Sequence, residues 1–163
     1  MKYICKFGEW PEFKESNDNK KCVKELHGQG LYSIQLSEGK GYEDLSLIDT
    51  EPFSSEELKK DRNELADKLS VLKDCDCRIV YIGSAALGNN EDGIYRRLNQ
   101  FYRTIKNGKG NHKGGCSVAY LKNWEELEIW AETYKGNVRP EESSRIRAFK
   151  AKYGVYPFAN RRG

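Results

Sequence analysis

Residues 78–83, Arg-Ile-Val-Tyr-Ile-Gly, form the clearest β-strand pattern in the sequence, because the run is β-branched and aromatic and ends at a glycine. Residues 30–36 (GLYSIQL) lie between turn residues and alternate between apolar and polar side chains, which predicts a second strand. Residues 127–134 (LEIWAETY) also alternate and predict a third. The sequence therefore predicts three short strands.

Helical patterns separate these strands. Ser54 stands three residues before Glu57, which is a capping-box pattern, and Pro140 suits the first turn of a helix that ends at Gly154. A Gly- and Lys-rich loop is predicted over 107–115. The spacing predicts three helices, at residues 54–73, 92–106 and 140–153. Interspersed helices and strands predict a small α/β domain.

Length and composition predict a single domain over residues 1–163. The chain is 37% apolar and 33% charged, and no apolar run approaches the ~20 residues that a membrane helix needs. Residues 1–10 contain one apolar patch, Tyr3 to Cys5, before a polar loop, and they lack the features of a signal peptide. We therefore expect a cytoplasmic protein with no membrane partner.

The five cysteines are widely spaced, odd in number and without a C-x-x-C pair. This pattern fits a reducing compartment better than a disulfide framework. Cys75 and Cys77 with His112 and Cys116 could form a zinc site, although their spacing is not a common one. Ordinary, partly buried thiols are the alternative.

The charge is divided unevenly along the chain. Residues 1–93 hold 13 Lys and Arg against 19 Asp and Glu, whereas residues 94–163 hold 15 against 6, so the two parts carry net charges of −6 and +9. A basic half can attract DNA, because Lys and Arg contacts to phosphates supply most sequence-independent affinity. A solvated basic surface is the alternative.

Glu142 stands at the head of an apolar helix face. Residues spaced four, three and four apart share one side of the last predicted helix: Glu142, Ile146, Phe149 and Tyr153. The carboxylate should therefore meet the body of the domain, whereas Glu141 points elsewhere. The alternative is an acidic residue that favours the helix dipole in the first turn.

Arg97 borders the apolar stripe of the helix predicted over 92–106, while Arg96 is rotated outward. An arginine at the margin of a core face can place its guanidinium in a cleft, where its planar fork of donors matches a phosphate. Alternatively, its stem packs on apolar neighbours and its head stays in water. Tyr32 and Tyr81 lie on predicted strands, where tyrosine is usually a core or edge residue.

Taken in order, these segments resemble the GIY-YIG nuclease family. Gly30-Leu31-Tyr32 and Tyr81-Ile82-Gly83 are similar to its two tripeptides, and Arg97-Leu98 followed by Tyr102 is similar to its Arg-Leu pair. Residues 112–115 (HKGG) and the closing segment from Glu142 through YGVYPFANRR (153–162) resemble one branch of the family.

The resemblance covers about residues 30–36 and 78–162. It implies a small three-stranded, mainly antiparallel sheet flanked by helices. Residues 37–77 would be a helical insertion between the first two core strands, which is tolerable because the cost of closing a loop grows slowly with its length.

The resemblance also implies an enzyme, a hydrolase that cuts DNA phosphodiester bonds as an endonuclease with Mg²⁺ or Mn²⁺. Glu142 would be the metal ligand, since Mg²⁺ often uses only one or two carboxylates. Arg97 would neutralise charge on the phosphate. Tyr32 would orient or deprotonate the attacking water, and Tyr81 would position the water or Tyr32.

Further residues have implied roles. His112 is a second candidate base, or a phosphate contact, because its pKa is better placed than that of a phenol. Asn160 would bind phosphate or fix the active-site loop. Five basic residues are candidate contacts to the nucleic-acid backbone: Lys106, Lys109, Lys113, Arg161 and Arg162.

Two other classes of function remain open from the sequence. One is a catalytically silent nucleic-acid-binding module with the same fold, and the other is a zinc-stabilised interaction domain. A nuclease with one active site cuts one strand at a time, so double-strand cleavage would require a homodimer or repeated encounters. The recognition sequence and the choice between DNA and RNA are not encoded in any pattern we recognise.

Overall fold

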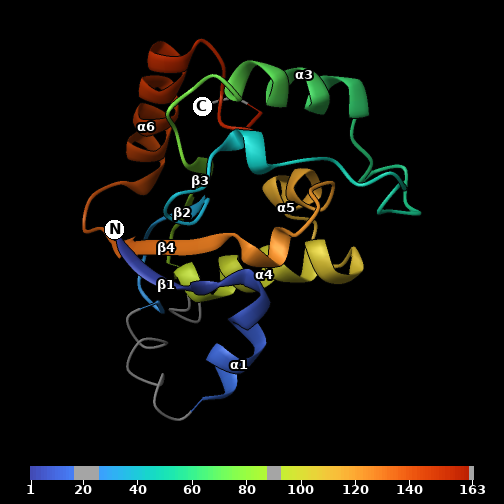
Figure 1. Cartoon of the computed structure of the whole chain (residues 1–163). Coiled ribbons are helices and arrows are strands. Elements are labelled where there is room, and N and C mark those ends of the chain that lie inside the picture. Colours follow the sequence, from blue (N-terminus) through green and yellow to red (C-terminus); the bar gives the residue numbers. More distant parts are fainter. Residues whose placement is uncertain (17–25, 88–92, 162–163) are drawn as a thin grey trace.

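The structure is a computed structural model that describes residues 1–16, 26–87 and 93–161. It is an α/β domain in which helices flank a four-stranded antiparallel sheet (Figure 1). Arg162, Cys22 and the predicted helix start at Asp92 lie outside the described residues.

The sheet has the strand order β1-β4-β2-β3. Its strands are β1 (Lys2–Lys6), β2 (Gly30–Gln35), β3 (Ile79–Ala85) and β4 (Glu128–Thr133). The three predicted strands are confirmed, but the predicted number of three is wrong. The extra strand, β1, contains the apolar patch near the N-terminus, which is too short for a periodicity signal and pairs antiparallel with β4.

The helices surround this sheet. Their bounds are α1 (Trp10–Glu15), α3 (Arg62–Leu72), α4 (Gly93–Asn107), α5 (Lys113–Val118) and α6 (Val138–Tyr153). Helix α6 ends as predicted at Gly154, which has a φ of 80°. No helix within the described ranges is long and apolar enough to cross a membrane.

Two local predictions were wrong. Helix α3 begins at Arg62 rather than Ser54, because the Asp61 carboxylate caps it by accepting the N–H groups of Asn63 and Glu64. Residues 113–118 form α5 rather than the end of a loop. Its glycines lack helix propensity, but Gly115 packs tightly on α4, so tertiary contact decides the local structure.

The sheet separates two layers of helices. Tyr32 and Ile34 of β2 point toward the side of α4 and α5, whereas Leu31 and Ser33 point toward α6, because side chains alternate along a strand. Figure 1 shows α6 and α4 on opposite sides of the sheet. In β3, Tyr81 shares the face of Ile34, and Ser84 shares the face of Leu31.

The outer edge of β3 is covered by the C-terminal segment. The N–H of Ala159 donates to the carbonyl of Val80 at 2.9 Å, and the side chain of Asn160 pairs with the peptide of Ile82. Covering this edge satisfies backbone groups that an edge strand would otherwise leave exposed. The cover leaves the C-terminal end of β3, with Ser84 and Ala85, to border a cleft.

Candidate active site

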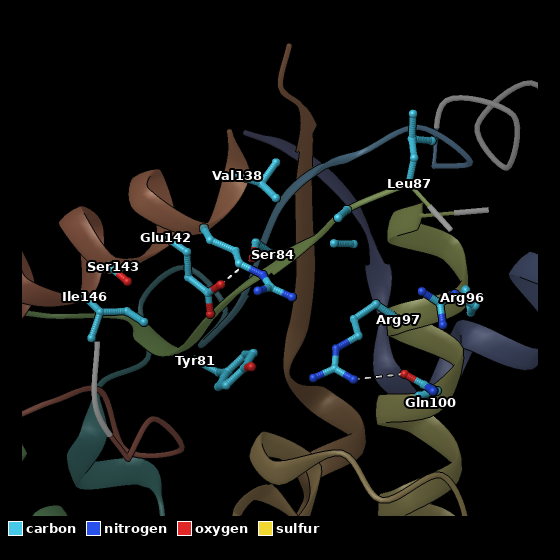
Figure 2. Close-up of a pocket in the computed structure, with 13 residues that line it drawn as sticks. Tyr81, Ser84, Leu87, Arg96, Arg97, Gln100, Val138, Glu142, Ser143 and Ile146 are labelled. Atoms are coloured by element: carbon cyan, nitrogen blue, oxygen red, sulfur yellow. Dashed lines mark hydrogen bonds between the residues drawn. The ribbon is translucent and has the colours of Figure 1, made fainter. Parts of the chain in front are cut away.

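A polar cleft of about 560 Å³ lies at the end of β3, between α4 and α6. Side chains from both faces of the sheet reach the cleft, because β3 is an edge strand of the sheet. Figure 2 shows Glu142 and Arg97 on opposite sides of this cleft, with Tyr81 between them. The residues of the cleft used below are Tyr81, Ser84, Arg97, Gln100, Arg139 and Glu142.

Glu142 lies in the first half of α6 and is half-buried at the wall of the cleft. Ile146 and Phe149 on the same helix face are buried, as predicted from their spacing. One carboxylate oxygen, Oε2, accepts a hydrogen bond from the hydroxyl of Ser84. Burial raises the pKa of Glu142, while the Ser84 hydrogen bond and the charges of Arg97 and Arg139 oppose that rise.

Arg97 projects from α4 into the cleft. Its Nη1 donates to the side-chain oxygen of Gln100 at 3.0 Å, one helical turn along α4, so the guanidinium is oriented by its own helix. Burial raises the pKa of both Tyr81 and Glu142, and the charge of Arg97 opposes both rises. Arg96 and Arg139 also line the cleft and add positive charge, Arg139 from a position three residues before Glu142 on α6.

The two candidate tyrosines occupy different positions. Tyr81 lines the cleft and is 8% exposed, whereas Tyr32 is completely buried behind it. Their ring centroids are 5.9 Å apart. Burial raises the pKa of Tyr81 to about 12 and that of Tyr32 well above its usual value. The hydroxyl that reaches the cleft is therefore that of Tyr81.

His112 is completely buried and serves as the N-cap of α5. Its Nδ1 accepts the N–H of Gly115 at 3.2 Å, and its Nε2 lies 2.9 Å from the hydroxyl oxygen of Tyr32. Burial and the charge of Arg97 hold the pKa of His112 well below its usual value, so the ring is neutral. Because Nδ1 is unprotonated, Nε2 carries the ring proton and donates a hydrogen bond to the hydroxyl oxygen of Tyr32.

This protonation state bears on the choice of base. A ring that donates to Tyr32 does not accept the proton of Tyr32, and His112 does not line the cleft. The geometry places Tyr32 and His112 behind Tyr81, where they can orient its ring. Neither of them touches the space that a substrate could fill.

Asn160 is buried at 5% exposure, and both ends of its amide bond the backbone of Ile82. Its Oδ1 accepts the N–H of Ile82 at 2.9 Å, and its Nδ2 donates to the carbonyl of Ile82 at 2.8 Å. Of the two roles expected from the sequence, the structure supports fixing a segment beside the cleft. Asn160 does not line the cleft, and one N–H of its amide is committed to Ile82.

The candidate backbone contacts lie outside the cleft. Lys106 and Lys109 are exposed at the C-terminal end of α4, and Lys113 is exposed at the start of α5. Arg161 is exposed and borders a different cavity. The structure therefore brings Tyr81, Arg97 and Glu142 together and leaves these four basic residues outside the cleft.

Sequence reasoning missed Ser84, Gln100 and Arg139. Two of them had a usable signal, because Gln100 follows Arg97 by three residues and Arg139 precedes Glu142 by three, so each pair shares a helix face. Ser84 directly follows the Tyr81-Ile82-Gly83 tripeptide. Its contact with Glu142 depends on how α6 packs against β3, which no local pattern encodes.

Cys75, Cys77, Cys116 and His112, the candidate zinc ligands, do not form a metal site. Cys5, Cys75, Cys77 and Cys116 are free thiols, and both ring nitrogens of His112 have partners within the protein. Among residues 1–16, 26–87 and 93–161, no three or more His, Cys, Asp or Glu side chains form a group that could hold a metal.

The cleft is nevertheless compatible with a hard divalent cation held by one carboxylate. The second oxygen of Glu142 has no hydrogen bond within the part of the chain that the structure describes. The carboxylate is partly desolvated, so a cation there would lower its energy. Mg²⁺ often binds one or two carboxylates and keeps several waters, so the residues present fit it.

A scan against protein-family models, a search of curated proteins and a search of solved structures each returned no match to this chain.

Proposed function

We propose that this protein is a divalent-metal-dependent endonuclease of the GIY-YIG type that hydrolyses DNA phosphodiester bonds. One observation carries the proposal: a carboxylate, Glu142, and a guanidinium, Arg97, face each other across a polar cleft with the Tyr81 hydroxyl between them. A phosphodiester needs positive charge on its oxygens and a positioned water, and this cleft offers groups for both.

Glu142 would hold Mg²⁺ or Mn²⁺ through its free oxygen, while Ser84 fixes the other oxygen. Bound there, the cation would supply Lewis-acid stabilisation of the charge that develops on the leaving oxygen. The order of the motifs along the chain and their meeting at the end of β3 support the likeness to GIY-YIG enzymes.

Arg97 and Arg139 would bind the non-bridging oxygens of the scissile phosphate. An arginine fork matches a phosphate in shape and charge, and Gln100 holds Arg97 in place before substrate binds. Stabilisation of charge in the transition state by one such group contributes about 10²–10³-fold to a rate. The basic half of the chain supports a polyanionic substrate.

Tyr81 would orient the attacking water. At neutral pH its phenol is protonated, because burial raises its pKa to about 12, so its oxygen accepts a hydrogen bond from the water. Tyr32 and His112 would act as positioning residues that fix the Tyr81 ring from behind.

A catalytically silent nucleic-acid-binding module is the second candidate. It is favoured by the complete burial of Tyr32 and His112, which removes two of the six candidate catalytic side chains from contact with substrate. In that case Arg97 and Arg139 would bind phosphate without hydrolysis.

The test is cleavage of supercoiled plasmid by the purified protein, with Mg²⁺, with Mn²⁺ and with EDTA. We expect nicked or linear product with either metal, none with EDTA and none from Glu142→Gln. Glu141→Gln is the matched control, because Glu141 pairs with Arg145 on α6 and does not line the cleft. DNA binding without cleavage under any metal would instead establish the silent module.

A further inference from the structure

A second cavity, of about 300 Å³, lies between the start of α3, α5 and the C-terminal segment. None of its lining residues lines the cleft that contains Glu142. Four cations border it: Lys59, Lys60, Lys68 and Arg161. Two carboxylates, Asp61 and Glu64, also border it, so positive charge exceeds negative charge.

Most of these charges already have partners. Lys59 pairs with Glu56, and Lys68 donates to backbone carbonyls of the C-terminal segment, including that of Phe158 at 3.3 Å. The Asp61 carboxylate caps α3.

Two cations remain available. The ammonium of Lys60 and the guanidinium of Arg161 have no hydrogen bond or ion pair within the described residues. Burial and the nearby charges of Arg161 and Lys113 lower the pKa of Lys60, and the carboxylate of Glu64 opposes this only in part. Several positive charges thus lie close together and repel one another, and a bound anion would reduce this repulsion.

A buried hydroxyl points to the same conclusion. Ser117 lines this cavity, is 3% exposed, and its hydroxyl has no hydrogen-bond partner in the described part of the chain. Buried polar groups are almost always hydrogen-bonded, so an unpaired hydroxyl beside two free cations indicates a missing acceptor. A phosphate oxygen has the required charge and accepts hydrogen bonds.

The segments that border the cavity contact β3 near Tyr81. Arg161 directly follows Asn160, which is fixed to Ile82, the residue after Tyr81. The backbone of Gly114, one residue after Lys113, packs on the Tyr81 ring, where an added Cβ would lie 2.6 Å from a ring carbon. The C-terminal segment that borders this cavity is therefore hydrogen-bonded to β3, the strand that borders the cleft.

We propose that Lys60, Arg161 and Ser117 form a second phosphate-binding site, which holds a backbone phosphate of the nucleic-acid substrate away from the scissile one. This rests on the proposed function, because it takes the strand in the cleft as the source of the phosphate. The site would position the strand without reading its sequence.

The test is binding of a short DNA duplex in EDTA, measured over a range of salt concentrations. We expect Lys60→Gln to reduce the slope of log K against log salt by about 0.9, the value for one lost phosphate contact. We expect Ser117→Ala to weaken binding about fivefold, the value of one hydrogen bond. Lys73→Gln, an exposed lysine at the other end of α3, is the matched control and should leave both quantities near wild type.

A backbone-neutralisation series identifies the phosphate. Each duplex carries one methylphosphonate in place of one phosphate. At one position other than the scissile phosphate, the substitution should weaken DNA binding by wild type but not by Lys60→Gln. The proposal is overturned if Lys60→Gln and Ser117→Ala bind like Lys73→Gln, or if the protein binds no nucleic acid.

The plasmid assay separates the two proposals. If wild type cleaves plasmid and Lys60→Gln binds DNA as wild type does, the second site is overturned and the nuclease is kept. A loss of binding in Lys60→Gln without any plasmid cleavage would keep the second site and overturn the nuclease. Melting temperatures of all variants establish that each one folds.

Discussion

The Nε2 atom of His112 lies 2.9 Å from the hydroxyl oxygen of Tyr32, in a space that neither side chain shares with solvent. Because Nδ1 of His112 accepts the N–H of Gly115, the proton of the neutral ring is on Nε2, which donates a hydrogen bond to Tyr32. This contact joins the N-cap of α5 to β2 and makes His112 a structural neighbour of the cleft.

Replacing His112 with Asn should destabilise the protein. Asn can still accept the N–H of Gly115 but does not reach Tyr32, so a buried hydroxyl loses its partner at a cost of about 1–3 kcal/mol. Chemical denaturation of His112→Asn, Tyr32→Phe and the double variant measures the coupling. The double variant should cost less than the sum of the single variants, and strict additivity would contradict the contact.

The stability of the protein should fall as the pH drops below about 6.5, the ordinary pKa of histidine. Burial and Arg97 hold the pKa of His112 below that value, so the unfolded chain takes up a proton that the folded chain does not. Stability is therefore complete above the unfolded pKa and is lost as the pH falls toward the folded one. Chemical denaturation between pH 7.5 and pH 5 should show this decrease in the free energy of unfolding, and the decrease should be smaller in His112→Asn.

Glu142→Gln should stabilise the protein in EDTA at neutral pH, by about 0.5–2 kcal/mol as for other strained functional sites. Burial raises the pKa of Glu142, so its contribution is favourable at low pH and is lost as the pH rises through the folded pKa. Mg²⁺ at 100 times its Kd should then stabilise wild type by about 2.7 kcal/mol and leave Glu142→Gln unchanged. An equal effect of Mg²⁺ on both would place the metal elsewhere.

Ser84→Ala should reduce metal-dependent cleavage by about 10–100-fold, the usual cost of removing a group that orients a metal ligand. The Ser84 hydrogen bond lowers the pKa of Glu142, so the acid limb of the pH–rate profile should move to higher pH. Ser144→Ala, an exposed position on α6, is the control. A lower rate with an unmoved acid limb would mean that Ser84 does not act through Glu142.

Asn160→Ala should cost about 2–4 kcal/mol, because it removes two hydrogen bonds and leaves the Ile82 peptide unpaired in a buried site. Asn160→Asp keeps an acceptor for the Ile82 N–H but sets a second carboxylate oxygen against the Ile82 carbonyl in a buried site, so it should also destabilise the protein. The affinity of Asn160→Ala for DNA should match wild type at a temperature where the variant is folded, because Asn160 does not line the cleft. A weaker affinity would show that Asn160 contacts phosphate.

The sequence determined what short-range periodicity can encode. The runs at 30–36 and 127–134 predict β2 and β4 by their alternation, and the run at 78–83 predicts β3 by its β-branched and aromatic residues. Glu142 faces the domain because Ile146 and Phe149 share its helix side. The C-terminal stop of α6 at Gly154 is equally local, since a glycine accepts the positive φ that ends a helix.

Tertiary structure decided the rest. Strand β1 forms because β4 offers it a partner, and α5 is helical because its glycines permit close packing on α4 and Tyr81. The contact of Ser84 with Glu142, the burial of Tyr32 and His112, and the approach of Lys60 to Arg161 all join residues more than fifty positions apart. No local propensity encodes such distances, because they depend on how helices and strands pack once the core is formed.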